Sequence, residues 1–446
     1  MPRRIVIIGA HAAGVDAAAA ARKTDRKAEI TLMTKQKTQG YSPCGIPYVL
    51  GGQIPSFEDL VVFPPSYFRM MKLDLRLETT ATNIDTEAKT VETEDKKDKK
   101  ETLEYDSLVL TTGAYPFVPP IKGHEKQGVH VVRTIEDGQR IDKALKTAES
   151  AAVIGAGVIG LETAVAFVER GVKTAVAELL PYALPAMLDK DMADSVHEML
   201  EQKGLRIIVG HGADELLGKD KITGISVAGE TIPADLVVVA TGVRANVELA
   251  KNAGIALGQT RAIKANARMQ TNVKDVYAAG DCAESIHMVT KRPALPQLGT
   301  TAVKQAKVAG VNAAGGYAVF PGVLGSAVTK LFDIEIGVTG LNEFFAGRAG
   351  LKTVAGTISS KTKADYYPGA LPIRIKIVVE KESERVIGGQ IIGGEAVTQR
   401  VNALSFAIQK QMTVRELAKA DTAYAPPVNE TWEPMILAAE IAIRKL

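Results

Sequence analysis

A glycine-punctuated segment that occurs twice constrains the fold of this chain more than any other feature. Residues 4–14 and 152–160 each join a short apolar run to a glycine turn, about 146 residues apart, and an alanine-rich stretch follows each turn. A second β-like run comes next, at Glu29–Met33 and at 173–177. This order of elements opens a doubly wound nucleotide-binding fold. The sequence therefore predicts an α/β protein with two Rossmann-like domains that each bind a dinucleotide.

The second copy carries the complete glycine fingerprint, Gly155-x-Gly157-x-x-Gly160. Such a turn lets the backbone approach a pyrophosphate at the positive end of the following helix. Glu178 stands where these folds place their acidic ribose ligand, about 20 residues further on. A carboxylate there accepts hydrogen bonds from a free 2′-hydroxyl and repels a 2′-phosphate. The sequence therefore predicts NADH rather than NADPH in the middle domain, and an ordinary strand-end acid is the alternative interpretation of Glu178.

The first copy departs from this fingerprint in two places. It reads Gly9-Ala-His-Ala-Ala-Gly14, without the middle glycine, and Thr34 stands where the acidic residue is expected. A further similarity links Leu-Thr-Thr-Gly at 110–113 with Val-Ala-Thr-Gly at 239–242, each at the end of an apolar run. The first copy is thus compatible with a dinucleotide but does not prove one.

Composition excludes several classes of protein. Fifty-four Lys and Arg against 51 Asp and Glu leave a net charge of +3, too balanced for a nucleic-acid or acidic-lipid binder. No apolar run approaches the ~18 residues that span a bilayer, and no signal-peptide pattern opens the sequence, so we expect a cytoplasmic protein. Two cysteines, Cys44 and Cys282, are too few for a disulfide scaffold or a four-cysteine metal site, and we expect no metal.

The pattern changes at about Phe320. Segments 328–337, 373–380 and 386–392 are typical of antiparallel strands, and helices are predicted at about 395–410 and 430–445. The sequence therefore predicts a separate C-terminal α+β domain. The almost wholly charged segment 92–104 is interpreted as a solvated hairpin tip, with a docking patch as the alternative.

The segment 271–281, Thr-Asn-Val-Lys-Asp-Val-Tyr-Ala-Ala-Gly-Asp, resembles the second flavin fingerprint of FAD-dependent pyridine-nucleotide oxidoreductases. The chain resembles this glutathione-reductase-like family over its whole length. The resemblance implies an FAD domain formed by 1–115 and 245–320, an NAD domain at 116–244, and a dimerisation domain at 321–446. It also implies the cofactor-binding positions, which are Gly9, His11, Ala12, Ala13, Gly14, Thr34, Lys35, Ser42, Thr112, Gly113, Arg133, Gly280 and Asp281 for FAD, and Gly155, Gly157, Gly160, Glu178 and Gly242 for NADH.

The segment Tyr-Ser-Pro-Cys-Gly-Ile-Pro-Tyr at 41–48 contains a lone cysteine, without the cysteine pairs of glutathione or thioredoxin reductases. It resembles the single-cysteine subgroup, which comprises CoA-disulfide reductases, NAD(P)H persulfide and polysulfide reductases, and NADH oxidases and peroxidases. The resemblance implies that Cys44 cycles between thiolate and an oxidised form while flavin supplies electrons. A buried, inert cysteine is the alternative for Cys44, and packing beside FAD is expected for Cys282.

Two features discriminate within the subgroup. The peroxidases and oxygen-reducing oxidases carry a histidine at the position of Ala12, whereas His11 stands one residue earlier and is expected to line the flavin phosphates or to be structural. Segments 364–369 and 421–427 resemble C-terminal signatures of the disulfide and persulfide reductases. By this resemblance Tyr367 and Tyr424 of one subunit flank Cys44 of the other and donate a proton, with Tyr366 less favoured; packing of a dimer interface is the alternative.

Coenzyme A recognition has weaker support. Arg22 and Lys23 fit the basic positions that bind the nucleotide tail in CoA-using relatives, although a solvated helix end explains them equally well. Together these features predict an NADH-dependent FAD homodimer that reduces a small-molecule disulfide, persulfide or polysulfide, including CoA disulfide. The alternatives are an NADH oxidase that reduces oxygen to peroxide or water, and an electron-transfer or redox-sensing flavoprotein that serves a protein partner.

Overall fold

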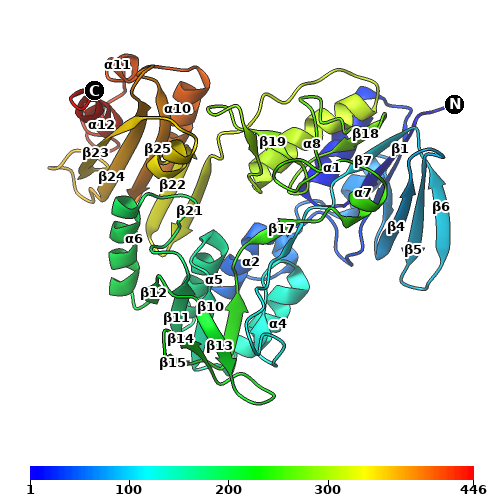
Figure 1. Cartoon of the computed structure of the whole chain (residues 1–446), viewed down its shortest axis with the longest axis horizontal. Helices are drawn as coiled ribbons and strands as arrows, with labels where there is room; N and C mark the ends of the chain where they lie inside the picture. Colours follow the sequence, from blue (N-terminus) through cyan, green and yellow to red (C-terminus); the bar gives the residue numbers. More distant parts are fainter. The chain divides into compact units, whose positions relative to one another are not determined.

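The computed structural model describes all 446 residues and divides into two compact units. Each unit is assembled from three separate stretches of the chain (Figure 1). Unit 1 comprises Met1–Ile46, Ile54–Pro116 and Val243–Val323, and unit 2 comprises Pro47–Gln53, Phe117–Gly242 and Leu324–Leu446. Unit 1 thus contains the residues expected for the FAD domain except 47–53, which pack with unit 2. The domain boundaries given above stay a prediction.

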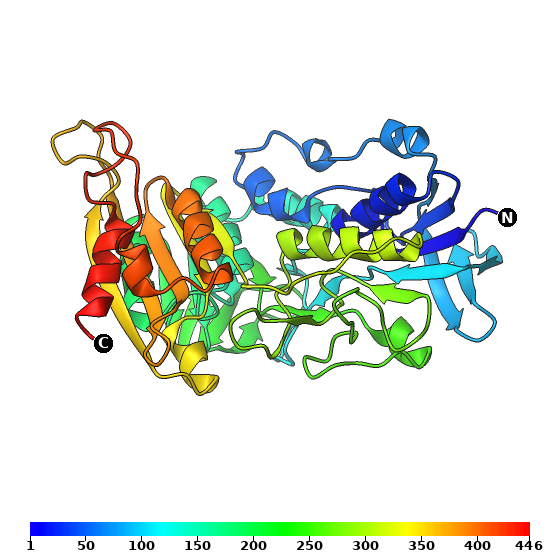
Figure 2. The same cartoon turned by 90° about the horizontal axis from the view of Figure 1, so that it is seen from above.

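Unit 1 is built on a five-stranded parallel sheet with the strand order β18-β7-β1-β2-β3. Its strands are β1 (Arg4–Ile8), β2 (Glu29–Met33), β3 (Asp74–Arg76), β7 (Ser107–Leu110) and β18 (Val276–Ala278). Helices α1 (Ala12–Thr24) and α8 (Gly299–Ala313) lie side by side against it in both views (Figure 1 and Figure 2). The two helices can pack closely because Gly310 on α8 has no side chain. A Cβ there would lie only 2.1 Å from the carbonyl oxygen of Ala17 on α1.

An antiparallel sheet of β4 (Thr79–Asp85), β5 (Thr90–Asp95) and β6 (Lys100–Glu104) completes the regular part of unit 1. The charged segment 92–104 covers β5, the turn and β6, so its interpretation as a hairpin is confirmed. The shorter elements are η1 (Pro43–Gly45), η2 (Glu58–Leu60), α3 (Pro65–Met70), β8 (Ala114–Pro116), β17 (Val243–Ala245), α7 (Glu248–Asn252), β19 (Ser285–Ile286) and β20 (Pro293–Ala294), and α2 (Ile46–Leu50) continues from η1 into unit 2.

The first half of unit 2 repeats the parallel architecture with the strand order β12-β11-β10-β16-β9. These strands are β9 (Val129–His130), β10 (Ser150–Ile154), β11 (Lys173–Glu178), β12 (Arg206–Val209) and β16 (Leu236–Val239). Helices α4 (Ile135–Leu145), α5 (Val158–Glu169) and α6 (Lys190–Gln202) accompany them, and β13 (Ala213–Leu217), β14 (Gly224–Val227) and β15 (Glu230–Pro233) form a small antiparallel sheet.

The second half of unit 2 is an antiparallel sheet with the order β21-β22-β25-β24-β23. Its strands are β21 (Ala327–Leu331), β22 (Ile334–Gly340), β23 (Thr353–Lys361), β24 (Pro372–Glu380) and β25 (Val386–Gly393), and its helices are α9 (Glu343–Arg348), α10 (Val397–Gln409), α11 (Val414–Leu417) and α12 (Pro434–Ile443). The predicted strand at 328–337 is in fact two strands, because Phe332 adopts a left-handed conformation (φ +55°) and reverses the chain. The predicted fold class, two Rossmann-like domains and a C-terminal α+β domain, is confirmed. No helix is both long and apolar enough to cross a bilayer.

Candidate active site

The first glycine turn joins β1 to α1 at the carboxyl edge of the parallel sheet. Gly9 has φ +118°, and a Cβ there would lie 2.2 Å from the carbonyl oxygen of Thr111, so only glycine fits. His11 is the N-cap of α1, but its side chain does not cap the helix. The first amides of α1, beginning with those of Ala12 and Ala13, are therefore left for an anion, which is the arrangement that binds a dinucleotide pyrophosphate. The turn thus fits FAD.

Other residues expected to bind FAD gather at the same sheet edge, beside the ends of β7 and β18. Thr112 donates a hydrogen bond through Oγ1 to the carbonyl of Asn246 (2.6 Å), and Gly113 follows it directly. Gly280 donates its amide to Oε1 of Gln305 on α8 (2.9 Å), which fixes the backbone that carries Asp281. The sequence did not indicate Gln305, because it is one of several polar residues in α8.

The remaining expected FAD ligands are less closely grouped. Thr34 is buried at the end of β2, where its amide donates to the carbonyl of Arg76 (2.9 Å), and Lys35 beside it is exposed. Arg133 belongs to unit 2, where its amide donates to Asp137 (3.1 Å) just before α4. The structure therefore brings all of these positions except Arg133 into unit 1.

His11 forms a polar cluster with Gln36 and Tyr41, and Tyr41 begins the segment 41–48 that contains Cys44. The His11 Nε2 lies 2.6 Å from Oε1 of Gln36, and the Tyr41 hydroxyl donates to the same oxygen (3.0 Å). The rings of His11 and Tyr41 meet edge to face at 4.5 Å. Because both rings bond to one glutamine oxygen, His11 holds the segment that leads to Cys44 in place. This geometry favours the structural interpretation of His11.

Cys44 lies in the short 3-10 helix η1 and is exposed, whereas Cys282 is fully buried. Ser42, two residues before Cys44, donates its amide to the carbonyl of Leu60 (2.9 Å), which anchors the segment. The Cys282 thiol points at the carbonyls of Ala279 (3.4 Å) and Leu110 (3.5 Å), and burial raises its pKa. An exposed thiol can meet a substrate, and a buried thiol with a raised pKa cannot serve as a nucleophile. Any thiol chemistry therefore falls to Cys44.

The second glycine turn joins β10 to α5. A Cβ at Gly160 would lie 2.0 Å from the carbonyl oxygen of Gly155, whereas Gly157 and Gly242 have open space beside them. The Glu178 carboxylate reaches back across the turn and accepts the amides of Ala156 (2.7 Å) and Leu180 (2.8 Å). An ionised carboxylate has about four lone-pair sites, so two remain for ribose hydroxyls. Gly157 supplies no side-chain cap to α5, and the turn fits a second dinucleotide.

A half-buried acid that the sequence did not indicate follows this turn on α5. Glu162 on α5 accepts hydrogen bonds from Thr329 Oγ1 on β21 (2.6 Å) and from the Tyr48 hydroxyl on α2 (3.3 Å). Burial raises the pKa of Glu162, and the two hydroxyl donors oppose that shift. Tyr48 follows Cys44 by four residues, so the acid is tied to the segment that carries the thiol. Its only sequence signal is one Glu inside an apolar helix.

Two of the three C-terminal tyrosines, Tyr366 and Tyr424, are hydrogen-bonded to each other, and the expected role of Tyr367 and Tyr424 at the other subunit's Cys44 stays a prediction. The Tyr424 hydroxyl lies 2.9 Å from the Tyr366 hydroxyl, and this hydrogen bond raises the pKa of Tyr366. Tyr366, which the sequence disfavoured, is 75% exposed, and Tyr367 is 40% exposed. The chain turns at this point, because the amide of Tyr367 donates to the carbonyl of Ala364 (2.8 Å). The turn directs Tyr366 rather than Tyr367 to Tyr424.

A buried ion pair holds the loop that carries Tyr424. Arg400 on α10 binds both carboxylate oxygens of Glu433 (2.7 and 3.1 Å) and donates to Oδ1 of Asn429 (2.8 Å). Asn429 in turn donates to the carbonyl of Ala423 (3.0 Å), directly before Tyr424. Charge-assisted bidentate pairs of this kind fix geometry as well as energy. The network therefore restrains Tyr424.

The two basic positions expected to bind coenzyme A differ in their surroundings. The Arg22 guanidinium donates to the carbonyls of Met71 (2.9 Å), Lys72 (2.8 Å), Arg26 (3.0 Å) and Ala28 (2.7 Å). Four of its five N–H groups therefore close the end of α1 against the following loops. Arg22 therefore has one N–H group left for a ligand, whereas the Lys23 side chain is exposed.

Comparison with known proteins agrees with this organisation. Residues 3–307 match the family model described as pyridine nucleotide-disulphide oxidoreductase, and residues 326–436 match the dimerisation domain of the same name. An "NADH oxidase" of Methanocaldococcus jannaschii is 44% identical, with 99% of each chain covered. An "NAD(P)H sulfur oxidoreductase (CoA-dependent)" of Pyrococcus abyssi is 35% identical, with 98% of each chain covered.

A solved structure shares the whole fold. The NAD-dependent persulfide reductase from A. fulgidus superposes with a TM-score of 0.96 at 39% sequence identity. The alignment covers 99% of this chain and 83% of the other.

Proposed function

Because the chain belongs to the pyridine nucleotide-disulphide oxidoreductase family, we propose that it reduces a sulfur–sulfur bond in a small molecule with electrons from NADH. Membership confirms the predicted flavoprotein oxidoreductase with FAD and NAD(P)H as cofactors. The matched dimerisation domain supports the predicted homodimer. The observation that carries the proposal is the exposed Cys44 in η1, paired with the burial of the only other cysteine, Cys282.

In the proposed reaction Cys44 acts as a thiolate nucleophile. It attacks one sulfur of the substrate, forms a mixed disulfide or persulfide at Cys44, and expels the other sulfur as a thiolate or hydrosulfide. Bound FAD supplies the electron pair, taken from NADH, that reduces this Cys44 adduct. The adduct then returns to the Cys44 thiolate and releases the second sulfur, so one NADH is consumed for each sulfur–sulfur bond.

The departing sulfur needs a proton donor, and we assign this role to Tyr424 of the partner subunit. Its hydrogen bond to Tyr366 supports Tyr366 as the second member of the pair, and Tyr367 stays a candidate from the sequence pattern. Proton transfer by a positioned side chain typically contributes about 10²–10⁴-fold to rate.

Subunit mixing tests the shared site. Cys44→Ser subunits are mixed with Tyr366→Phe/Tyr424→Phe subunits, and a shared site predicts more activity than either parent shows. No gain after proven subunit exchange, with both parents inactive, would assign the tyrosines to their own chain or to the interface alone.

The substrate we propose is a disulfide, persulfide or polysulfide of low molecular weight, with CoA disulfide and CoA persulfide among the candidates. The CoA-dependent sulfur oxidoreductase of Pyrococcus abyssi supports this class by similarity. Lys23 is the proposed contact for the CoA phosphates, because Arg22 is used by the fold. We propose a cytoplasmic location, where the coenzyme NADH is available.

A second candidate function is oxygen reduction, because one relative with 44% identity is named NADH oxidase. The test is anaerobic NADH turnover with CoA disulfide, polysulfide and small disulfides, compared with oxygen alone under matched conditions. We expect at least one sulfur acceptor to give a kcat/KM well above that of oxygen. Turnover with oxygen alone would establish the oxidase instead.

A further inference from the structure

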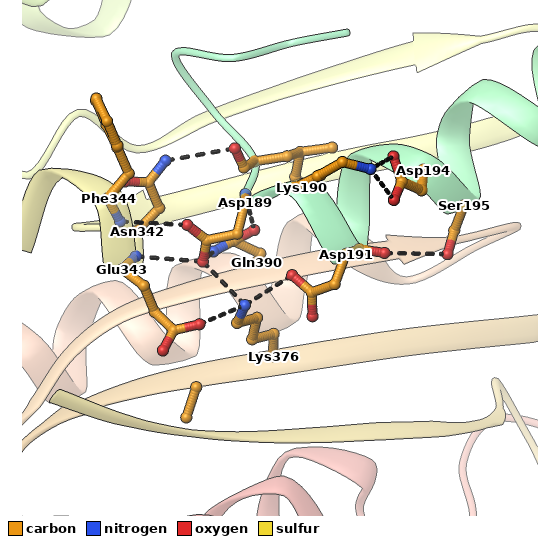
Figure 3. Close-up of polar contacts among 12 residues, drawn as sticks. Asp189, Lys190, Asp191, Asp194, Ser195, Asn342, Glu343, Phe344, Lys376 and Gln390 are labelled. Atoms are coloured by element: carbon orange, nitrogen blue, oxygen red, sulfur yellow. Dashed lines mark hydrogen bonds and ion pairs between the residues drawn. The ribbon is translucent and has the colours of Figure 1, made fainter. Parts of the chain in front are cut away.

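A lysine is buried where the dimerisation domain faces the NAD-binding half of unit 2. Lys376 lies in the middle of β24, and its side chain is only 4% exposed (Figure 3). Its Nζ lies 2.6 Å from Glu343 on α9, 2.7 Å from Asp191 and 3.1 Å from Asp189. The two aspartates belong to the NAD-binding half, where they bracket the start of α6. One ammonium group thus joins two domains.

Asp189 forms the centre of this junction. It is the N-cap residue of α6, but its side chain does not cap that helix. The carboxylate instead accepts Nε2 of Gln390 (2.6 Å) and the amides of Glu343 (3.2 Å) and Phe344 (3.4 Å) in the dimerisation domain. The Asp189 amide donates back to Oε1 of Gln390 (2.8 Å). Both the backbone amide and the carboxylate of Asp189 are therefore hydrogen-bonded to the dimerisation domain.

The charges in the cluster depend on one another. Burial alone lowers the pKa of Lys376, but hydrogen bonds to Asp191 and Glu343 raise it above its ordinary value, so the lysine is charged at neutral pH. Asp189 is itself buried. A buried charge that loses its partner is strongly disfavoured, so a neutral Lys376 would weaken the hold on the segment that ends at Asp189 and leave it to the hydrogen bonds from Gln390, Glu343 and Phe344.

That segment is the loop 179–188, which covers the second glycine turn. Leu184 donates its amide to the carbonyl of Ala156 in the turn (2.9 Å), and Leu180 donates to the Glu178 carboxylate (2.8 Å). The loop is therefore hydrogen-bonded to the second glycine turn through Leu184, and it ends at Asp189. Lys376 is thus linked to the turn through its ion pair with Asp189, the backbone of the loop and the hydrogen bond from Leu184 to Ala156.

We infer that Lys376 and Asp189 are positioning residues for the coenzyme, through which the dimerisation domain holds loop 179–188 in the conformation that binds NADH. The inference rests on the proposed function only in placing NADH at the second glycine turn. Neither Lys376 nor Asp189 belongs to the second glycine turn. If the loop adopts the competent conformation only a tenth of the time, coenzyme affinity falls about tenfold.

The test compares Lys376→Met with the matched control Lys190→Met. Lys190 lies on α6 and pairs with Asp194 (2.7 Å), but it is exposed and outside the cluster. Four quantities are measured in the FAD-loaded dimer: the dissociation constant of NAD⁺, the KM for NADH, the kcat, and the rate of amide exchange in residues 179–188. For Lys376→Met we expect a dissociation constant and KM raised about tenfold or more, faster exchange of the Leu180 and Leu184 amides, and kcat within about twofold. Lys190→Met should match the wild type.

Unchanged affinity and unchanged loop exchange in a correctly folded Lys376→Met dimer would overturn the inference. If that variant does not fold, Gln390→Met removes the two hydrogen bonds between Gln390 and Asp189 without altering charge. It should raise the NAD⁺ dissociation constant and the exchange rate of residues 179–188 to a smaller degree. Wild-type affinity in Gln390→Met together with wild-type exchange would be equally contradictory. NAD⁺ binding and amide exchange need no sulfur substrate. Both measurements therefore test the role of Lys376 even if the proposed sulfur reaction is wrong.

Discussion

The Tyr424 hydroxyl lies 2.9 Å from the Tyr366 hydroxyl, although 58 residues separate the two in the chain. Both side chains project from loops of the dimerisation domain and are exposed. In such a pair one hydroxyl donates to the other, so only one proton stays available to a third group. This geometry supports a pair that delivers a single proton to the sulfur leaving Cys44 of the partner subunit.

Tyr424→Phe should lower turnover of sulfur substrates about 10²-fold or more, because a positioned proton donor is lost. NAD⁺ binding and FAD content should not change. Tyr366→Phe should have a smaller effect in the same direction, since it removes only the partner hydroxyl. Steady-state rates with a disulfide and with a polysulfide provide the measurement. Tyr367→Phe is the matched neighbour, and a larger loss of turnover there than in Tyr366→Phe would favour Tyr367 as the second tyrosine, as the sequence pattern predicts.

Asn429→Ala should reproduce part of the Tyr424→Phe defect. The amide holds the Ala423 carbonyl (3.0 Å), and without it the Tyr424 loop loses a fixed point. We expect a loss of about tenfold in sulfur turnover, and no further loss when Asn429→Ala is added to Tyr424→Phe, since coupled residues are not additive. The exposed Lys419→Ala controls for general loop effects. Additive losses in the double variant would show that Asn429 acts independently of Tyr424.

Coenzyme choice should depend on Glu178. Two like charges 4 Å apart repel by about 4 kcal/mol at an effective dielectric of 20, so NADPH should be the poorer donor. We expect Glu178→Gln to narrow the NADH-to-NADPH ratio of kcat/KM by at least about tenfold. Because the carboxylate also accepts the amides of Ala156 and Leu180, the melting temperature of the variant is measured alongside. Equal use of both coenzymes by the wild type would mean that Glu178 does not face the ribose.

Glu162 should make stability depend on pH. Its pKa is raised in the folded state by burial, so its contribution to stability is fully present below the pKa of the unfolded chain and is lost as pH rises through the folded value. Glu162→Gln, which stays neutral, should therefore have a higher melting temperature than the wild type at pH 8 and lose that advantage at pH 4. Glu169→Gln on the exposed face of α5 is the control. A constant difference across this range would show that Glu162 does not titrate in it.

The sequence predicted the fold because local signals and tertiary structure agree. In each glycine turn a neighbouring backbone carbonyl lies so close that only glycine fits, as at Gly9 beside Thr111. The short apolar runs next to these turns are typical of buried strands. The exposed position of Cys44 in η1 was not predicted in this way, because only the family resemblance singled this residue out.

Long-range pairings could not be predicted in this way. Arg22 looks like a solvated helix-end cation in the sequence, yet carbonyls up to 50 residues away bind it. The sequence pattern favours Tyr367 over Tyr366, and only the turn at Ala364 shows that Tyr366 is the one that reaches Tyr424. Lys376 and Asp189 lie more than 180 residues apart, and nothing local indicates that either is buried.

The reaction of Cys44 is the central claim, and its most direct test is a comparison of Cys44→Ser with the wild type and with Cys282→Ala under anaerobic conditions. The assay uses the sulfur acceptor with the highest kcat/KM. For each protein we would measure the NADH oxidised and the thiol or hydrosulfide released. We expect Cys44→Ser to bind FAD and accept electrons from NADH normally, and to lose at least about 10³-fold in product release, while Cys282→Ala stays close to the wild type. Product release by Cys44→Ser at the wild-type rate would contradict the single-thiol mechanism.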